Sequence, residues 1–246
     1  MPHKIKNILI TRPKEDAEVL AAALQEMGFN PIIEPLLTIE PIYKDKKLLE
    51  SLLAKNPQAV LITSKYAVVA LAHMTALRNI SILTSGETTA ACAREAGFKN
   101  VASVNDTARV LVEYILKHFE PKNGSILYVR GAEVTEDIEG QLSEKDFSIE
   151  SVIVYNARPA SEFSGNLIEK INRGGVDAVV FFSQNTANTY IKHAVANQLA
   201  GAHQNMIAIC LSEAIAGTIR QLPWKDIAIS NQADVKSMIE KITEYK

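Results

Sequence analysis

Small polar residues recur wherever a predicted strand gives way to a predicted helix. These turns form three pairs along the chain: 11–13 with 129–131, 63–65 with 182–185, and 84–89 with 209–213. The first amides of a helix have no backbone partners, and the positive end of the helix dipole lies there. Such turns bind carboxylates or phosphates without a basic side chain. The chemistry that they predict is the binding of an anion, with the hydroxyls of Ser64, Thr88 and Ser183 as additional donors.

The same residues also have a purely structural interpretation. Serine and threonine are favoured N-caps of ordinary helices, so a single turn does not identify a site. Arg12 and Arg130 could pair with carboxylates of a ligand or tie their own turns together. The number of these turns, at matching positions, is what favours binding.

The elements that must position these turns alternate regularly. Ile8–Ile10 forms a short apolar run, and the helix predicted from Pro13 to Met27 has apolar residues three and four positions apart and ends at Gly28. Further strands are predicted at 59–62, 81–84, 101–104, 125–130, 151–155 and 176–182, with helical patterns between most of them. This alternation predicts an α/β fold of parallel sheets flanked by helices. The turns then lie at the carboxyl ends of the strands, where such sheets bind ligands.

The chain also contains an internal repeat. Residues 125–130 repeat residues 7–12 at an offset of 118 positions (130 − 12), and 181–183 repeats 62–64 at an offset of 119 (183 − 64). A repeat of this length predicts two similar α/β domains.

Two domain boundaries are compatible with this repeat. One lies near 121–124, between the two copies. The other places two crossings at 35–43 and 155–165, where proline or small polar residues gather. One domain would then span roughly 40–155, and the other would combine the N-terminal strand and helix with roughly 160–246. Sequence arithmetic alone does not choose between them.

Composition excludes several classes of protein. Of 246 residues, 47% are hydrophobic and 22% are charged, as in a globular chain. The 26 basic and 28 acidic residues give a net charge of −2, which argues against binding a nucleic-acid backbone. The 2 cysteines cannot form a disulfide framework and fit a reducing compartment. We expect a cytoplasmic protein, because the first apolar run is too short for a signal peptide and no run reaches the roughly 18 residues of a membrane helix.

Other motifs are missing or ambiguous. None of the 5 histidines has ligand spacing, so no metal site is predicted, and His73, His118 and His193 are expected to be solvated. The chain has no dinucleotide-binding G-x-G-x-x-G, Walker loop or G-x-S-x-G elbow. Tyr155 stands out because it ends the alternating run 151–155 beside a candidate crossing, although a packed strand aromatic would look the same.

Together these segments resemble the uroporphyrinogen-III synthase family. The matching motifs follow the family order along almost the whole chain: ILITRP at 8–13, Pro35-Leu36, LITSKYAV at 61–68, SGETTAACAREAGF at 85–98, ILYVRG at 126–131, VIVYNARP at 152–159, VVFFSQNTA at 179–187 and ICLSEAIA at 209–216. The last motif departs from the family pattern, because Cys210 replaces a glycine and Ser212-Glu213 replace threonines. This departure weakens the expected amide pocket at that turn.

The resemblance implies two similar domains, each a flavodoxin-like parallel sheet flanked by helices, joined by a two-stranded linker. It selects crossings at about 37–39 and about 156–159. One discontinuous domain would comprise 1–36 plus 160–246, and the other 40–155. It also implies an active site in the cleft between the domains.

The implied reaction is the cofactor-free cyclisation of hydroxymethylbilane, which carries eight carboxylates, to uroporphyrinogen III with loss of water and inversion of ring D. Loss of hydroxide gives an azafulvene-type electrophile, and attack through the wrong carbon gives a spiro intermediate, so orientation is the main contribution of the protein. Tyr155 matches the proton donor of the family. The implied substrate contacts are Thr11, Arg12, Pro13, Ser64, Ser85, Gly86, Thr88, Arg130, Ser183, Gln184, Asn185 and Ser212.

Two rival functions compete with this interpretation. One is a cytoplasmic two-domain protein that binds a small anion without catalysis, and the other is an α/β enzyme with a phosphorylated substrate held by the same turns. No nucleic acid, membrane, metal or cofactor is expected as a partner. A monomer is expected, because no exposed apolar stripe is evident.

Overall fold

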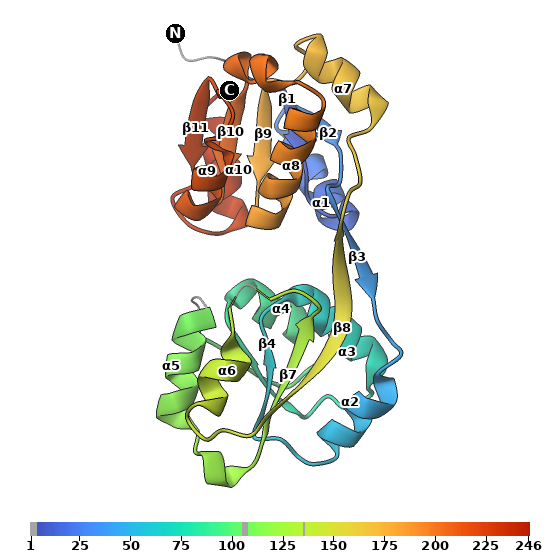
Figure 1. The fold of residues 1–246 in the computed structure, drawn as a ribbon, viewed down its shortest axis with the longest axis vertical. Helices are drawn as coiled ribbons and strands as arrows, with labels where there is room; N and C mark the ends of the chain where they lie inside the picture. The colour runs from blue at the N-terminus through green and yellow to red at the C-terminus, as the bar shows by residue number, and fades with distance from the viewer. Residues whose placement is uncertain (1–3, 105–107, 135) are drawn as a thin grey trace. The chain divides into compact units, whose positions relative to one another are not determined.

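Parallel β-strands alternate with α-helices in the computed structural model, which describes residues 4–104, 108–134 and 136–246 (Figure 1). The predicted α/β fold with parallel sheets flanked by helices is confirmed. The chain divides into two compact units, which we call the first unit (Met1–Thr38 with Arg158–Lys246) and the second unit (Ile39–Ala157). It therefore passes from one unit to the other twice.

The first unit is built on a five-stranded sheet with helices on both faces. The strand order is β11-β10-β9-β1-β2, with β1 (Asn7–Ile10), β2 (Asn30–Ile33), β9 (Ala178–Phe181), β10 (Ile207–Cys210) and β11 (Asp226–Ile229). One face packs against α7 (Gly165–Asn172), α8 (Gln184–Ala196) and α9 (Glu213–Ile219). The other face packs against α1 (Lys14–Glu26) and α10 (Val235–Thr243). A 3-10 helix, η2 (Ala200–Asn205), follows α8.

The second unit repeats this plan with one additional strand. Its sheet order is β3-β8-β7-β4-β5-β6, with β3 (Leu37–Pro41), β4 (Ala59–Ile62), β5 (Ser81–Thr84), β6 (Asn100–Ser103), β7 (Ile126–Gly131) and β8 (Ile149–Pro159). Helices α2 (Lys46–Leu53), α3 (Lys65–Met74) and α4 (Glu87–Glu95) cover one face. Helices α5 (Ala108–His118) and α6 (Ile138–Ser143) cover the other, and a 3-10 helix, η1 (Pro121–Asn123), precedes β7.

The two units share one topology because the two sequence repeats exchange strands. The first unit takes β1 and β2 from the first repeat and β9 to β11 from the second. The second unit takes β7 and β8 from the second repeat and β4 to β6 from the first. The orders β11-β10-β9-β1-β2 and β6-β5-β4-β7-β8 therefore correspond strand for strand. Because of this exchange, each unit combines strands from both repeats.

Apolar side chains on both faces of the strands explain why these segments form buried parallel sheets. In β1, Leu9 packs in the cluster that includes α8, whereas Ile8 and Ile10 pack in the cluster that includes α1. All three are fully buried. Helix α1 ends at Glu26, and the chain leaves it through Gly28, whose φ of 84° lies in the left-handed region that glycine adopts without strain.

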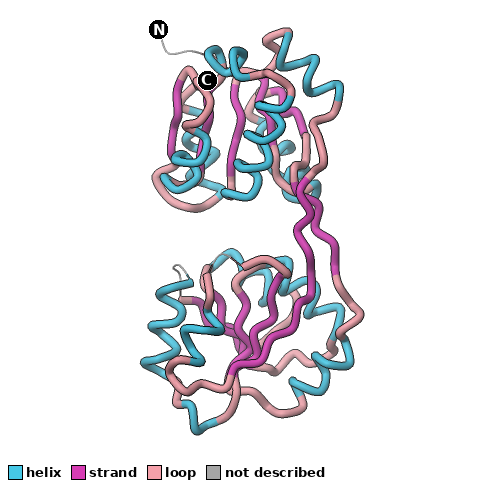
Figure 2. Tube along the Cα trace, in the orientation of Figure 1, coloured by secondary structure: helices cyan, strands magenta, loops and turns pink. Residues whose placement is uncertain are grey.

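Strands β3 and β8 carry the two crossings between the units. They are neighbours in the sheet, as Figure 2 shows. Ile42 N donates to Val154 O (2.8 Å) and Ala160 N donates to Leu36 O (3.0 Å), so that rising numbers on one strand meet falling numbers on the other and the pair is antiparallel. Within the described part of the chain, no helix is long and apolar enough to cross a membrane.

Candidate active site

The candidate site of the second unit lies where its strand order reverses. The chain proceeds outward from β4 to β5 and β6 on one side, and from β7 to β8 on the other. Ligands of open α/β sheets bind at the carboxyl ends of the strands beside such a switch point. Here β4 is followed by Thr63 and Ser64, and β7 ends with Arg130 and Gly131.

Tyr155 reaches this edge because β8 contains a β-bulge. Arg130 pairs with Ile153, but Gly131 pairs with Tyr155, so Val154 is an extra residue on β8. Strict alternation would point Tyr155 to the face opposite Val154. In the structure Tyr155 instead packs against the core cluster that contains Val154. The bulge therefore redirects the phenol, as bulges near functional sites often do.

Three residues surround the phenol of Tyr155. The hydroxyl of Ser64 hydrogen-bonds to it, the ring of Tyr66 lies 5.9 Å away between centroids at an angle of 60°, and the backbone of Gly131 lies directly against it. Burial raises the pKa of Tyr155 above its ordinary value of 10, and the hydrogen bond from Ser64 partly opposes this rise. The phenol is therefore fully protonated at neutral pH.

Ser64 has a second bond that orients its hydroxyl. It is the N-cap of α3, and its Oγ accepts from Tyr66 N at 3.3 Å. Because Oγ accepts there, its own proton is available to donate to the phenol oxygen of Tyr155, which is the direction that lowers the pKa of a phenol. Tyr155 then keeps its O–H for a ligand.

A second pair of hydroxyls at the switch point was not predicted from the sequence. Thr63 Oγ1 and the hydroxyl of Tyr128, on β7, are 3.1 Å apart. Tyr128 is buried, and burial raises its pKa above 10. The sequence does show Tyr128 as the one aromatic residue in the otherwise aliphatic run 126–129 before Arg130. A tyrosine in such a run is equally typical of a functional site and of a hydrophobic core.

Arg130 is held by its own unit. Its Nε lies 2.9 Å from Glu139 Oε2, an ion pair that does not have hydrogen-bond geometry, and its guanidinium donates to Gly131 O at 3.0 Å. The side chain is largely buried. Of the two roles considered for Arg130, these contacts favour tying the turn together over direct pairing with a ligand.

The β5–α4 turn places its polar groups on the strand next to β4. Ser85 and Gly86 are half-buried, Thr88 is exposed, and Gly86 is the N-cap of α4 in an extended conformation. Thr84 is buried and its Oγ1 donates to Gly86 O at 3.2 Å. This bond fixes the turn, so that the amides of the first helical turn remain available to a ligand.

In the first unit, the β1–α1 turn uses its side chains internally. Thr11 is buried and its hydroxyl donates to Val180 O at 3.1 Å. Arg12 forms an ion pair with Asp16 at 2.8 Å and lies 4.2 Å from the centre of the Phe182 ring. Pro13 is the buried N-cap of α1. These contacts again favour a structural role for the arginine.

The β9–α8 turn of the first unit is more open to a ligand. Ser183 caps α8 by accepting from Thr186 N at 3.2 Å, and Gln184 and Asn185 are exposed. Ser183 follows β9, which is the neighbour of β1 and marks the switch point of this sheet. Each unit therefore has one capping serine at its switch point.

The β10–α9 turn carries the substituted motif. Ser212 is the N-cap of α9 but its side chain makes no capping bond. Cys210 is fully buried, and burial raises the pKa of its thiol to about 12, so it is an inert core residue.

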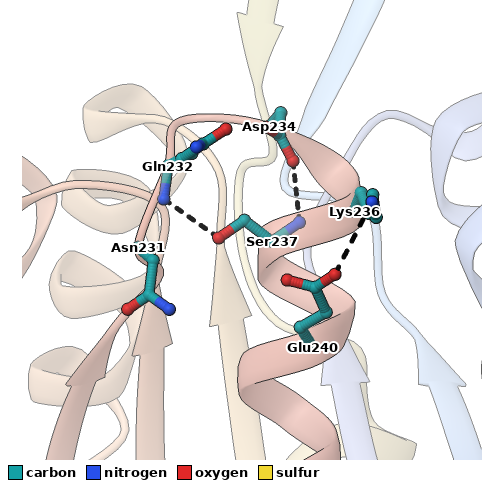
Figure 3. A pocket seen from close by; sticks show the side chains of 6 residues that line it. All are labelled: Asn231, Gln232, Asp234, Lys236, Ser237 and Glu240. Carbon is teal, nitrogen blue, oxygen red and sulfur yellow. Dashed lines mark hydrogen bonds and ion pairs between the residues drawn. The ribbon is translucent and has the colours of Figure 1, made fainter.

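A small polar pocket of about 200 Å³ opens at the neighbouring β11–α10 turn (Figure 3). Asp234 Oδ1 accepts from Ser237 N at 2.7 Å, Ser237 Oγ accepts from Gln232 N at 2.9 Å, and Lys236 lies 3.9 Å from Glu240. The two carboxylates at its edge oppose an anion, and the pocket contains none of the residues predicted from the sequence.

One expectation about the histidines is wrong. His193 is not solvated but buried, because its ring packs edge-on against Phe163 and its Nε2 lies 2.9 Å from Ala160 O. Helical periodicity alone did not reveal that this face of α8 lies inside. Among the described residues, no group of three or more His, Cys, Asp or Glu side chains could hold a metal ion.

The fold and the turns at the carboxyl ends of its strands define a protein of two doubly wound α/β units, each with a capping serine at its switch point. The family model described as uroporphyrinogen-III synthase HemD matches residues 18–240. Because this match covers most of the chain, the chain belongs to the uroporphyrinogen-III synthase HemD family.

Two relatives match along nearly the whole chain. The porphyrin biosynthesis protein HemD of Ruminiclostridium josui is 23% identical over 250 residues, covering 96% of this chain and 48% of the relative. The chain thus spans about half the length of that protein. The uroporphyrinogen-III synthase of Chlorobaculum parvum (strain DSM 263 / NCIMB 8327) is 21% identical over 248 residues, covering 98% of this chain and 99% of the relative.

Two solved structures have the same fold. A mutant uroporphyrinogen III synthase from the extremely thermophilic bacterium Thermus thermophilus gives a TM-score of 0.66 at 18% identity, covering 98% of each chain. The uroporphyrinogen-III synthetase from Helicobacter pylori 26695 gives 0.63 at 15% identity, covering 98% of this chain and all of the other.

Proposed function

We propose that this protein is a uroporphyrinogen-III synthase, which cyclises hydroxymethylbilane to uroporphyrinogen III with loss of water and inversion of ring D. Membership of the family over residues 18–240 supports the reaction. The observation that carries the proposal within the fold is Tyr155, a protonated phenol held by Ser64 at the switch point of the second unit.

Tyr155 acts in this proposal as the general acid. Its O–H donates to the hydroxyl of the substrate as the carbon–oxygen bond breaks, so that water leaves and an azafulvene-type cation remains. The hydrogen bond from Ser64 stabilises the negative charge that develops on the phenol oxygen. The phenolate regains its proton when ring closure restores the aromatic pyrrole and releases one. The overall reaction therefore loses one molecule of water and consumes no other reactant.

The protein binds the substrate carboxylates at the carboxyl ends of its strands. The proposed contacts are those predicted from the sequence: Thr11, Arg12, Pro13, Ser64, Ser85, Gly86, Thr88, Arg130, Ser183, Gln184, Asn185 and Ser212. Internal bonds occupy the side chains of Thr11, Arg12 and Arg130, so we assign their turns a role through backbone groups. Helix N-termini suit a polyanion in a chain with a net charge of −2, because they attract anions without added basic residues.

We further propose that the protein acts as a monomer in the cytoplasm, without a metal or organic cofactor. The reaction supports the absence of a cofactor, because an electron-rich pyrrole expels hydroxide and the protein contributes a proton and orientation.

A coupled assay tests the function. Hydroxymethylbilane is generated in situ with and without the protein, the products are oxidised, and the porphyrin isomers are separated by chromatography. The expected product is predominantly the type III isomer, whereas spontaneous closure gives type I. An isomer distribution equal to that of the control without protein would reject the synthase, and isothermal titration with the small carboxylate citrate would then test the non-catalytic anion-binding alternative.

A further inference from the structure

Gly131 is the last residue of β7, and the ring of Tyr155 lies against its Cα. A Cβ at this position would lie 2.6 Å from Tyr155 Cζ, 2.9 Å from the phenol oxygen and 3.0 Å from Cε2. The φ of Gly131 is outside the left-handed region, so alanine can adopt the same backbone conformation without strain. The contact with Tyr155 is therefore what requires glycine here.

The backbone of β8 cannot move away to make room. Ala132 N donates to Tyr155 O at 2.9 Å, which fixes Tyr155 to the end of β7. Ile42 N donates to Val154 O at 2.8 Å from the other side of β8. A Cβ on Gly131 would consequently move the ring of Tyr155 rather than the strand.

From these contacts we propose that Gly131 is a positioning residue that sets where the phenol oxygen of Tyr155 lies. The absence of a side chain lets the ring rest on the backbone of β7, at the point where the Val154 bulge has turned it toward Ser64. The catalytic consequence of this position rests on the proposed function, whereas the position itself does not.

The size of the displacement follows from the distances. A Cβ contact is essentially never shorter than 3.0 Å and is ordinary from 3.4 Å, so Gly131→Ala must move Tyr155 Cζ from 2.6 Å by at least 0.4 Å (3.0 − 2.6), and by 0.8 Å (3.4 − 2.6) to restore ordinary contact. The strength of a hydrogen bond depends steeply on distance and angle, so a shift of this size alters the bond between Ser64 and the phenol. A misplacement of about 1 Å can reduce turnover about 100-fold.

The direct test is NMR of the protein labelled with ¹³Cζ-tyrosine. The resonance of Tyr155 is assigned by its disappearance in Tyr155→Phe. We expect this resonance to shift in Gly131→Ala and to stay in place in the control Gly217→Ala, whose Cβ meets nothing within 4 Å. A Tyr155 resonance that does not move in folded Gly131→Ala overturns the proposal.

Activity measurements distinguish positioning from general damage. If Gly131 acts through the phenol, Gly131→Ala lowers kcat about as much as Tyr155→Phe and leaves KM nearly unchanged. The kcat of the double variant Gly131→Ala/Tyr155→Phe is then no lower than that of Tyr155→Phe alone. Losses of kcat that multiply in the double variant contradict the proposed route. A wild-type protein without synthase activity would reject the proposed function alone, because the NMR comparison does not depend on turnover.

A second variant keeps the test decisive if Gly131→Ala does not fold. Tyr155→Ala removes the ring that the new Cβ would meet. We therefore expect Gly131→Ala/Tyr155→Ala to fold with a thermal midpoint close to that of Tyr155→Ala. A double variant that remains unfolded while Tyr155→Ala folds shows that glycine is needed for another reason and overturns the proposal.

Discussion

The substitution Tyr155→Phe removes one oxygen atom and keeps the aromatic ring. The ring continues to pack on Gly131, Tyr66 and the core cluster, so the change isolates the hydroxyl. The variant lacks one neutral hydrogen bond with Ser64, so its free energy of unfolding should be lower by about 1 kcal/mol. Ser64 still accepts from Tyr66 N, so α3 keeps its cap.

The effect on turnover is expected to be larger than the effect on stability. A positioned proton donor contributes about 10²- to 10⁴-fold to a rate. The pyrrole already assists the departure of hydroxide, so we expect the lower end, a decrease in kcat of about 100-fold, or about 2.7 kcal/mol. The type III isomer should still form, because the residues that orient the substrate are intact.

The pH dependence gives this prediction a second measurement. Burial raises the pKa of Tyr155, so the phenol keeps its proton through neutral pH and loses it above about 10. The wild-type kcat should therefore be flat from about pH 7 to 9 and fall at higher pH, whereas Tyr155→Phe should lack that fall. The same raised pKa contributes stability below pH 10 that is lost as the pH rises through the folded-state value.

The assay is the coupled isomer assay with initial rates of type III formation across this range of pH. The matched control is Tyr245→Phe, which removes a phenol hydroxyl that donates to Asp226 at 2.7 Å in the first unit. We expect its kcat to equal that of the wild type. A Tyr155→Phe enzyme with unchanged kcat and an unchanged alkaline fall would refute the general-acid role of Tyr155.

Three further predictions concern the supporting structure. Ser64→Ala should lose about 1 kcal/mol of stability with its cap and also lower kcat, whereas Ser164→Ala, which removes the cap of α7, should lower only the urea midpoint. Burial lowers the pKa of His203, so its neutral form contributes stability above about pH 6.5, and this stability is lost as the pH falls. In urea unfolding across pH, the free energy of unfolding of His203→Gln should therefore decrease less on acidification than that of the wild type. Phe181→Ala should destabilise the first unit by about 3–5 kcal/mol in calorimetry, because Phe181 is fully buried; a loss below about 1 kcal/mol would contradict this packing.

Much of the fold could be read from local patterns. The strands at 59–62 and 81–84 lie where the apolar runs predict them, and the predicted helix from Pro13 to Met27 is observed as Lys14–Glu26. Short apolar runs bounded by turn residues have few alternatives to a buried parallel strand. The capping serines were also recognisable, because an N-cap depends on residues only three positions apart.

Side-chain contacts, most of them between different elements, decided which of these residues can act on a ligand. Arg12 and Arg130 look equivalent to binding residues in the sequence, but each has a carboxylate partner on the helix that follows its strand. Buried His193 and the Thr63–Tyr128 pair likewise depend on packing between elements that periodicity does not describe. Asp16 is only four residues from Arg12, but the partners of His193 and Thr63 come from distant elements and are therefore set by the tertiary fold.

The sequence by itself determined the alternation of strands and helices, the repeat and the polar turns at strand ends, since each is written in residues that are close along the chain. Only the tertiary structure decided how the repeats exchange strands and where the phenol of Tyr155 points. The direction of Tyr155 depends on a one-residue bulge at Val154 and on the room left by Gly131 on the neighbouring strand. Both are properties of strand pairing, in which a shift of one residue reverses the face that a side chain occupies.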